Sequence, residues 1–483
     1  MKPQARPAAC VMVCGTSSGA GKSLLTTALA RFYANRGLKV APFKAQNMSN
    51  NARVVDQGEM GSAQYLQALA ARRIPDVRMN PVLLKPERDT HSQVVVLGRR
   101  DDRLAGLPWR QRSNELWPTV SRCLAELLDE NDLVVIEGAG SPAEINLQET
   151  DIVNMRIAEA AAAATLLVCD IDRGGAFAHL YGTYLLVPAA QRRLIRGFVL
   201  NKFRGDPTLL APGPEYLKSL TGVPLLGVLP MWREHGLPEE DGVFDERPTG
   251  AGLAVSIVAY PRISNLDEFA PLRRIPGVAV SWARSPGTLA ASEVVILPGS
   301  KHVADDLIWL RSRGLDAAIR AHVTAGKPLL AVCGGLQMLG RELRDPHGVE
   351  GAGEGLGLIA LRTEYEAIKS CRRGTYAFGE LSGFWAGLSA VSFEGYEIRH
   401  GRTEPEADEV TVAPRPVLPG GLGWQQGQVL ALYAHGLFEN AAILQALFGA
   451  EVPTLDDTFE GLADFAETHL GAQTLDGLVR PSS

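Results

Sequence analysis

The sequence predicts an α/β protein with two domains, and three observations lead to this prediction. First, short continuous apolar runs alternate with helix-like segments along most of the 483 residues, as in parallel sheets that helices cover on both faces. Second, the first apolar run leads directly into a glycine-rich loop. Third, a later run ends in a single cysteine that two glycines follow.

The alternation of strands and helices is interrupted once, and the interruption divides the chain. Residues 235–250 are polar, acidic and rich in glycine and proline, so we expect a linker there. The first domain, a parallel sheet with a phosphate loop, is expected over residues 1–234 and the second over residues 251–447, with a C-terminal extension over residues 448–483. The apolar runs include ACVMVCG, LKVAPFK, DLVVIEGAG, TLLVCDID, IRGFVLNKF and PLLGVLP before the linker, and LAVSIVAY, VAVSWA, EVVILPGS, PLLAVCGG and VLALYAHG after it.

The composition is that of an ordinary globular protein and argues against several classes. Hydrophobic residues make up 46% of the chain and charged residues 21%. The formal net charge of −6 argues against a nucleic-acid-binding protein with a broad basic face. No apolar run reaches the ~20 residues that a membrane-spanning helix needs. The six cysteines are scattered and form no zinc pattern, so we expect a cytoplasmic protein. The sequence does not indicate an oligomeric state.

The glycine-rich loop, GTSSGAGKS, lies between the first apolar run and a helix-like segment. Backbone N–H groups of such loops close around phosphates at a helix N-terminus, and Gly19 and Gly21 are expected to permit this. Lys22 is expected to neutralise phosphate oxygens and Ser23 to bind magnesium, so we predict an ATP site. Counted from its first glycine, the loop is one residue longer than the strict phosphate-loop pattern. The alternative is an ordinary glycine turn.

Polar residues also close three later apolar runs of the first domain. Glu137 is expected to hold magnesium directly or through water. Asp170 and Asp172 close another run, and Asn201 closes a third, where it is expected to contact the nucleotide. Each could alternatively be a polar cap of a strand. Open α/β sheets bind ligands at the carboxyl ends of their strands, so the set together favours a site.

The segment FKAQNMSNN follows a further strand of the first domain. Lys44 is expected to contact phosphate, although a solvated loop lysine would have the same spacing. Gln46, Asn47 and Glu59 are further candidates for contacts to the nucleotide or to an acceptor substrate.

The cysteine of the second domain, Cys333, lies on a predicted strand-to-helix turn. A helix N-terminus favours the thiolate form of a cysteine, which is the nucleophile. The following Gly334 leaves room for a backbone N–H group that could hold an oxyanion. The alternative is a buried structural cysteine, which is what most single cysteines are.

A cysteine nucleophile needs a base, and His435 closes another predicted strand about a hundred residues downstream. A third strand ends at Gly299 and Ser300, whose N–H groups are expected to complete the oxyanion hole. Three other histidines are weaker candidates for the base, because none closes so clear a strand: His302, His322 and His400.

Several of these segments resemble those of known families. AVCGGLQMLG and YAHGLFEN are similar to the class I glutamine amidotransferase domain, which has a flavodoxin-like α/β fold, and GTSSGAGKS resembles the phosphate loop of dethiobiotin-synthetase-type ATPases. The two together resemble the cobalamin-pathway amidotransferases. Within these, the cobyric acid synthase family is most similar to FKAQNMSNN, MNPVLLKP, NKFRGD, YPRISNLDEF and GYEIRHGRT. The resemblance runs from about residue 10 to about residue 445.

The resemblance implies roles for the residues that match. Cys333 would attack the side-chain amide of glutamine, His435 would be the base, and Gln337 is expected to contact the glutamine. Many class I glutaminases have a glutamate two residues after the histidine, where this chain has Leu437. We therefore expect a Cys–His dyad, with Glu439 as the alternative third member.

The resemblance also implies the reaction and its cofactors. ATP with Mg²⁺ would activate carboxylates, and ammonia from glutamine would convert them to amides. The implied acceptor is a corrinoid, adenosylcobyrinic acid a,c-diamide, with its b, d, e and g carboxylates as the sites. The family pattern GYEIH is altered here, because Arg399 precedes His400, and no role for His400 is implied.

Three alternatives remain open at this point. One is cobyrinic acid a,c-diamide synthase, which amidates the first two carboxylates. Another is a different ATP-dependent glutamine amidotransferase, such as a cell-wall subunit. The third is a partitioning-type regulatory ATPase, which would leave Cys333 and His435 without a role. All but the last predict small-molecule substrates, and none of the expected partners is a nucleic acid or a membrane.

Overall fold

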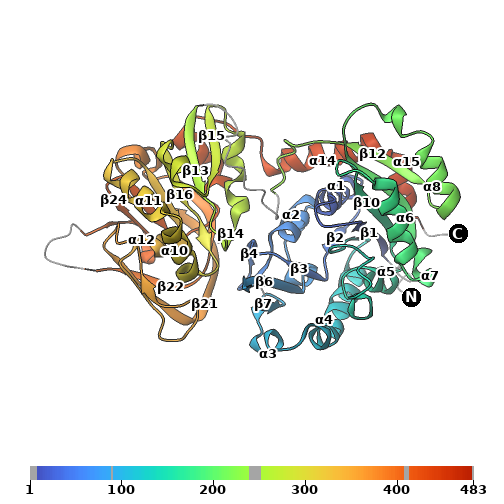
Figure 1. Cartoon of the computed structure of the whole chain (residues 1–483), viewed down its shortest axis with the longest axis horizontal. Helices are drawn as coiled ribbons and strands as arrows, with labels where there is room; N and C mark the ends of the chain where they lie inside the picture. Colours follow the sequence, from blue (N-terminus) through green and yellow to red (C-terminus); the bar gives the residue numbers. More distant parts are fainter. Residues whose placement is uncertain (1–7, 89–90, 239–251, 407–412, 481–483) are drawn as a thin grey trace.

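The computed structural model describes residues 8–88, 91–238, 252–406 and 413–480. It has two lobes, each built around a central sheet (Figure 1). Figure 1 draws the lobe of the N-terminal half in blue and green, and the lobe that begins after the predicted linker in yellow and orange. Most of that linker, residues 239–250, lies outside the described residues. The predicted α/β class with two central sheets is confirmed.

The first lobe contains a six-stranded sheet in which all neighbouring strands are parallel. The strand order is β12 (Leu225–Pro230), β11 (Ile195–Phe203), β10 (Ala164–Asp170), β1 (Ala9–Gly15), β9 (Leu133–Glu137) and β2 (Val40–Phe43). The helices of this lobe include α1 (Lys22–Asn35), α2 (Ser62–Ala70), α4 (Trp109–Glu130), α5 (Met155–Ala160), α6 (Ala176–Leu186) and α8 (Gly213–Thr221). Strands β1, β9 and β10 are buried almost throughout, which explains why each is a continuous apolar run.

The second lobe contains a seven-stranded sheet that is parallel over five strands and antiparallel at one edge. Its order is β15 (Val278–Ala283), β13 (Leu253–Val258), β16 (Val294–Leu297), β18 (Leu329–Val332), β25 (Val429–Leu432), β24 (Gly423–Gln426) and β23 (Arg415–Leu418). The helices include α9 (Pro286–Ala290), α10 (Val303–Ser312), α11 (Leu315–Thr324), α12 (Gly334–Leu339) and α13 (Ala441–Phe448). Cys333 and His435 follow the adjacent strands β18 and β25, so the topology brings them to one edge.

Smaller elements join the lobes. In the first lobe, β4 (Ala52–Val55) and β5 (Gly58–Gly61) form a hairpin, and β3 (Gln46–Met48) pairs with β6 (Val82–Arg88). In the second, β21 (Leu361–Ala377) and β22 (Ser392–Pro405) form a long antiparallel pair. Strand β4 packs against both β21 and β22. The short hairpin of the first lobe therefore reaches the strand that carries the GYEIRHGRT segment.

The C-terminal extension returns to the first lobe. Helix α14 (Leu455–Leu470) packs along α1, and both α14 and α15 (Ala472–Leu478) contribute to the first hydrophobic core. The guanidinium of Arg31 on α1 pairs with Asp456 at 2.5 Å and with Glu460 at 3.0 Å. The red α14 accordingly lies against the blue part of the chain in Figure 1.

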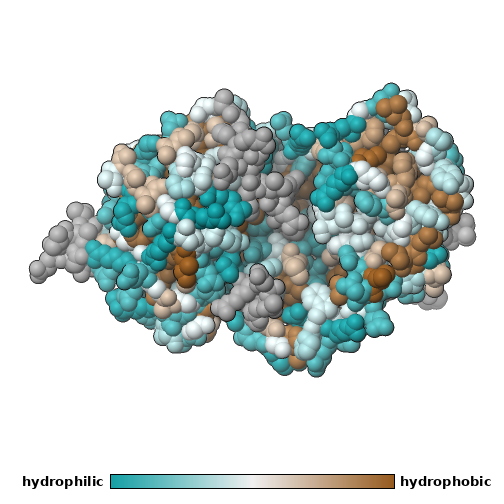
Figure 2. Space-filling view, in the orientation of Figure 1, coloured by the Kyte–Doolittle hydropathy of each residue, from teal (hydrophilic) through white to brown (hydrophobic). Residues whose placement is uncertain are grey.

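The surface of the first lobe carries apolar side chains over the part that contains α6 and α8, as the brown colour in Figure 2 shows. The large hydrophobic residues that are exposed on α6, on α8 and in the neighbouring turn η3 (Pro207–Leu210) are Leu185, Leu186, Leu209, Tyr216 and Leu220. None of the helices in the described part of the chain combines the length and the apolar character of a membrane span.

Candidate active sites

Cys333 lies at the turn between β18 and α12, as the sequence predicts. Its backbone has φ +50° and ψ −104°, a conformation that side chains other than glycine rarely adopt. The strand side of the turn is held because Cys333 N–H donates to Leu432 O at 2.7 Å. The helix side is held because Gln337 N–H donates to Cys333 O at 3.1 Å. Strained backbone at a nucleophile is typical of an active-site elbow.

The two glycines after Cys333 are required by close packing. A Cβ atom on Gly335 would lie 2.1 Å from Leu297 O, and one on Gly334 would lie 2.5 Å from Ser300 N. A Cβ on Gly299 would lie 3.1 Å from His435 Cε1. The three residues that were predicted to form the oxyanion hole, Gly299, Ser300 and Gly334, therefore gather beside the nucleophile and the histidine. Their role in catalysis stays a prediction.

His435 lies beside a third group that the expected dyad does not include. Its Nδ1 lies 2.8 Å from Glu268 Oε1, and the neighbouring Cys333 raises the pKa of the imidazole. The Cys333 thiol itself donates to Ile398 O at 3.7 Å. The second oxygen of Glu268 accepts from Gly436 N–H at 2.8 Å. The Cys–His pair expected from the sequence therefore has a carboxylate beside it, and the catalytic roles of these residues stay a prediction. Glu439, the alternative third member, pairs with Arg53 at 2.5 Å and leaves the orienting position to Glu268.

The electrostatics of this triad favour a charged imidazole. Burial lowers the pKa of His435, but the Glu268 carboxylate and Cys333 raise it, and the pKa reaches about 10. An imidazolium beside the cysteine stabilises a thiolate, which is the reactive form. The arrangement therefore suits nucleophilic attack on a carbonyl group followed by protonation of the leaving group.

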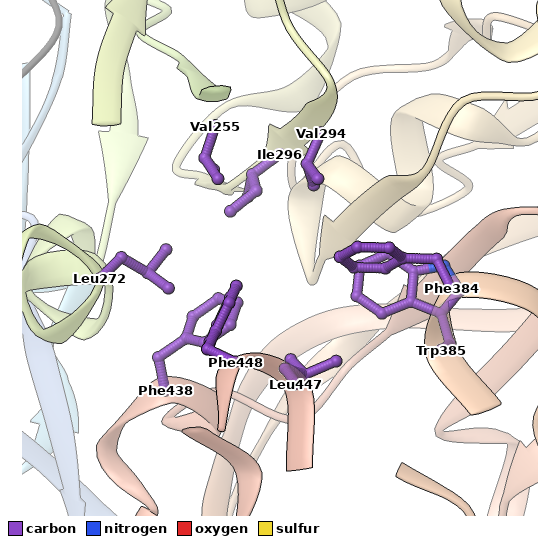
Figure 3. Close-up of a pocket in the computed structure, with 9 residues that line it drawn as sticks. All are labelled: Val255, Leu272, Val294, Ile296, Phe384, Trp385, Phe438, Leu447 and Phe448. Carbon is purple, nitrogen blue, oxygen red and sulfur yellow. The ribbon is translucent and has the colours of Figure 1, made fainter. Parts of the chain in front are cut away.

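Aromatic and apolar groups fix the elements behind the triad. The ring of Tyr396 on β22 stacks on His435 with centroids 5.2 Å apart and planes 16° apart. Figure 3 shows a cavity next to these elements, which is lined only by apolar side chains, among them Leu272 and Phe438. Its volume of about 10 Å³ is that of one water molecule at most. This cavity is a packing void and holds no substrate.

The other predicted residues of the second lobe make contacts within the protein, and the contact of Gln337 to glutamine stays a prediction. The amide of Gln337 is buried and contacts Tyr365 Oη at 3.3 Å and Tyr433 Oη at 3.4 Å. The three rival histidines are committed elsewhere. His302 caps α10, His322 contacts Pro328 O at 2.9 Å, and His400 contacts Glu366 O at 3.0 Å.

The phosphate loop of the first lobe joins β1 to α1. Gly19 and Gly21 have φ +70° and +98°, in the region that glycine adopts without strain. A Cβ on Gly21 would lie 2.0 Å from Asn201 Nδ2, which donates to Ala20 O at 2.9 Å. Asn201 therefore holds the loop backbone, whereas the sequence predicted a contact to the nucleotide. Lys22 Nζ donates to Ser17 O at 2.9 Å and to Gly140 O at 3.2 Å.

Glu137 is the centre of a polar cluster beside this loop. Its carboxylate accepts from Ser23 Oγ at 2.9 Å, from Lys44 Nζ at 2.7 Å and from Gln67 Nε2 at 2.5 Å. Burial would raise the pKa of Glu137, but Lys44 and these hydrogen bonds lower it, so the carboxylate is charged. The structure thus brings together four predicted residues: Lys22, Ser23, Lys44 and Glu137.

The cluster fits a magnesium ion that also binds phosphate. Mg²⁺ prefers oxygen ligands and usually takes one or two from the protein. The Ser23 hydroxyl and the Glu137 carboxylate supply two such oxygens at 2.9 Å from each other. Among the residues that the structure describes, no group of three or more histidine, cysteine, aspartate or glutamate side chains is placed to hold a metal ion.

The remaining candidates lie around this centre or away from it. Asp170, the last residue of β10, pairs with Lys202 at 3.1 Å, and Asp172, just after the strand, pairs with Arg204. Gln46 and Asn47 are buried on β3. Glu59 lies at the boundary between the lobes, where it pairs with Lys85 at 2.7 Å and Lys369 at 2.9 Å. The expectation that Glu59 contacts the nucleotide or the acceptor substrate stays a prediction.

Sequence reasoning missed three residues of these centres: Glu268, Gln67 and Arg53. Glu268 lies within the segment YPRISNLDEF, which carried a family resemblance but no assigned chemistry. Gln67 and Arg53 had no signal of their own, because a buried glutamine in a helix or an arginine in a short strand matches no motif.

Comparison with known proteins assigns a domain family to each half of the chain. Residues 11–239 match the family model described as the CobQ/CobB/MinD/ParA nucleotide binding domain. Residues 254–443 match the CobB/CobQ-like glutamine amidotransferase domain. The chain is 61% identical over 475 residues to "Cobyric acid synthase" of Variovorax paradoxus (strain S110), covering 97% of this chain and 99% of the relative.

Two further relatives carry the same name. Identity is 59% over 496 residues with the protein of Polaromonas sp. (strain JS666 / ATCC BAA-500), covering 97% of this chain and 98% of the relative. It is 60% over 492 residues with that of Albidiferax ferrireducens (strain ATCC BAA-621 / DSM 15236 / T118), covering 98% and 99%. Identity at this level over nearly entire chains shows that this chain belongs to the cobyric acid synthase family.

Proposed function

We propose that this chain uses ATP and glutamine to convert the b, d, e and g carboxylates of adenosylcobyrinic acid a,c-diamide to amides, giving adenosylcobyric acid. The observation that carries the proposal is the pairing, in one chain, of a Cys333–His435–Glu268 triad with a phosphate loop and its Glu137 cluster. The names of the relatives support the acceptor, and the protein's own residues support the two half-reactions. A partitioning-type ATPase would leave the triad without a role.

The glutaminase half-reaction follows from the triad. The Cys333 thiolate attacks the side-chain amide carbon of glutamine, and backbone N–H groups near Gly334 and Ser300 stabilise the oxyanion. The His435 imidazolium gives its proton to the leaving nitrogen, so that ammonia departs and a thioester remains. Neutral His435 then takes a proton from water, which attacks the thioester and releases glutamate. Glu268 keeps the imidazole oriented through both steps.

The synthetase half-reaction takes place at the phosphate loop. ATP transfers its γ-phosphoryl group to a carboxylate of the acceptor, because ammonia reacts with an acyl phosphate and not with a carboxylate. Lys22 and Lys44 would neutralise phosphate oxygens. Ser23 and Glu137 would hold Mg²⁺, which supplies further charge neutralisation when it is bound. Lys44 and Ser23 would then exchange their bonds to Glu137 for bonds to these ligands.

The ammonia has to pass from the second lobe to the first as a neutral molecule. We expect the path to run through the contact between the lobes, where β4 packs on β21 and β22. A cytoplasmic location is part of this proposal. All six cysteines are free in the structure, which agrees with a reducing compartment.

The experiment that tests the proposal compares the wild type with Cys333→Ala, using ATP, magnesium and the corrinoid diamide. Each protein receives either glutamine or a high concentration of ammonium, and amide formation is followed by mass spectrometry. We expect the variant to amidate the corrinoid with ammonium but not with glutamine. Wild-type behaviour with glutamine would show that Cys333 is structural. Failure of both proteins with both nitrogen sources would overturn the acceptor assignment.

A further inference from the structure

A charged residue of the first lobe lies next to the triad of the second. Arg53 belongs to β4, and only 3% of it is exposed. Its guanidinium pairs with Asp267 and, at 2.5 Å, with Glu439 Oε1, and both partners belong to the second lobe. Its Nε donates to Ser62 Oγ at 3.1 Å. Burial lowers the pKa of Arg53, but the two carboxylates raise it well above its ordinary value, so the group is always charged.

Each residue of the second lobe that Arg53 contacts is close to a triad residue, either along the chain or through a direct contact. Asp267 precedes Glu268 in the turn η4 (Leu266–Arg274). Glu439 ends the turn η7 (Leu437–Glu439), which begins two residues after His435. The guanidinium also lies 5.1 Å from the centroid of Tyr396, the ring that stacks on His435. Arg53 thus touches the supports of the base and of the residue that orients it.

The positive charge of Arg53 also offsets the negative charges of the carboxylates around it. Burial raises the pKa of Glu439, and the charges of Asp267 and Glu268 raise it further. Buried like charges repel, and removing the cation between them leaves uncompensated charge in the interior. The carboxylates would then have to move apart or take up protons, and Glu268 would lose its defined position against the imidazole.

The backbone next to Arg53 is fixed to the same part of the second lobe. Ala52 N–H donates to Asn265 Oδ1 at 3.0 Å, and Leu266 N–H donates to Asn51 Oδ1 at 3.1 Å. The partner Ser62, which also donates to Asp267 at 2.5 Å, is the first residue of α2. Gln67 on the same helix contacts Glu137 of the nucleotide site, and five residues of helix rise only ~7.5 Å.

We propose that Arg53 is a positioning residue of the glutaminase, supplied by the synthetase lobe, which holds Glu268 and His435 in the geometry that hydrolyses glutamine. The proposal rests on the proposed function, because it assigns Arg53 to the triad argued above. It means that the second lobe has a complete glutaminase only while the first lobe is docked on it. Arg53 touches no substrate and acts only through Asp267, Glu439 and Tyr396.

The test uses the full-length protein with Arg53→Met, which removes the charge and keeps most of the stem, and with Arg53→Lys, which keeps the charge. The matched control is Arg122→Met, which breaks an exposed arginine–glutamate pair on α4. For each protein we would measure kcat and KM for glutamine hydrolysis, ammonium-supported amidation, and the melting temperature. A further readout is the rate at which iodoacetamide alkylates Cys333, followed by mass spectrometry of its peptide.

We expect Arg53→Met to lower kcat for glutamine hydrolysis by about 10²-fold, the order of effect when catalytic groups are displaced by about 1 Å. KM for glutamine and ammonium-supported amidation should change less than about threefold, and alkylation of Cys333 should slow, because a displaced imidazolium no longer stabilises the thiolate. Arg53→Lys should recover part of the activity, because it keeps the charge but not the fork of donors.

Three outcomes would overturn the proposal. One is a kcat for Arg53→Met within twofold of the wild type. A second is an equal loss of glutamine-dependent and ammonium-supported amidation together with a lower melting temperature, since Arg53 would then only stabilise the fold. The third outcome applies if Arg53→Met does not fold. In that case, an Arg53→Lys protein with an unchanged kcat and an unchanged alkylation rate would overturn the proposal. By contrast, persistent glutamine hydrolysis in Cys333→Ala would refute the proposed glutaminase itself.

Discussion

The two candidate sites of this chain differ in how complete they are without a ligand. In the candidate glutaminase site, His435 is already bonded to Glu268 and interacts electrostatically with Cys333, and Cys333, His435 and Glu268 are 7%, 1% and 1% exposed. In the nucleotide site, the groups that would face phosphate and magnesium bond to one another instead, with Ser23 and Lys44 both on Glu137.

The difference reflects the chemistry of the two half-reactions. Nucleophilic catalysis uses groups that belong to the protein, which can be arranged once by folding. Phosphoryl transfer also depends on the charges of the bound nucleotide and metal. Without these ligands, the residues that would bind them form hydrogen bonds and ion pairs with one another. Changes in the glutaminase site should therefore remove only glutamine hydrolysis. Changes in the nucleotide site should affect both ligand binding and phosphoryl transfer.

The largest effect is expected from Lys22→Met. Loss of this charge should lower amidation by about 10³-fold with either glutamine or ammonium, because it removes stabilisation of the transferred phosphoryl group. Hydrolysis of glutamine without ATP should stay within a few-fold of the wild type. The measurement is amide formation and ADP release with each nitrogen source. Undiminished ammonium-supported amidation would mean that the phosphate loop does not serve the synthetase reaction.

Glu268→Gln should separate the sites in the opposite direction. We expect kcat for glutamine hydrolysis to fall by about 10²- to 10³-fold, because the amide cannot stabilise the imidazolium or fix its tautomer. Ammonium-supported amidation should be unchanged. Glu439→Gln is the matched control and should lose less than about tenfold. A larger loss in Glu439→Gln than in Glu268→Gln would reassign the third member of the triad.

Gly335→Ala tests the close packing behind the nucleophile. The added Cβ would lie 2.1 Å from Leu297 O, so backbone has to shift. We expect a loss of about 3 kcal/mol in the free energy of unfolding, together with lower glutaminase activity. Gly374→Ala, where nothing lies within 4 Å of the added atom, should change stability little. Denaturant unfolding of the two variants measures the difference, and equal stabilities would contradict the argument.

The triad should also leave a signature in the pH dependence of stability. The pKa of His435 is raised to about 10 in the folded protein, against about 6.5 in an unfolded chain. Its protonation therefore stabilises the fold fully below pH 6.5, and this contribution is lost as the pH rises toward 10. Urea unfolding at several pH values should show the stability advantage of the wild type over His435→Gln shrinking as the pH rises. An advantage that grows with pH would refute the charged imidazole.

The smallest effect is expected where α14 packs along α1. Arg31→Met should cost only about 1 kcal/mol, because solvent screens its carboxylate partners; Asp456 and Glu460 are 69% and 37% exposed. Both activities should persist, and limited proteolysis should cut the C-terminal helices faster. Loss of either activity would mean that α14 does more than cover the first core.

Most of the nucleotide site could be predicted because its residues lie in short motifs at the ends of strands. Gly19 and Gly21 lie in one loop, Lys22 and Ser23 begin the helix that follows it, and Glu137 ends the strand beside β1. Lys44 also lies at this site, where its spacing alone had allowed a solvated lysine. Asn201 reaches the loop as well, although it holds the loop backbone at Ala20 O.

The glutaminase was predicted only in part. Cys333 and its glycines form a local motif, and His435 ends an adjacent strand, so both could be found. Glu268 lies 167 residues before His435 and meets it only after η4 packs on η7. The family pattern has a glutamate two residues after the histidine, which directed attention to the segment that follows His435. Glu439 of that segment forms an ion pair with Arg53 instead.

The sequence by itself determined the α/β class through the alternation of apolar runs and helix-like segments along the chain. It also located the phosphate loop and the turn of Cys333, the predicted nucleophile, because each is a local pattern of glycines at a strand end. Tertiary structure alone decided which carboxylate orients His435, where α14 returns and how Arg53 meets Asp267 and Glu439. These contacts join segments far apart in the chain. A single buried Glu or Arg has no periodic or spacing signal, and only packing decides which charges it faces.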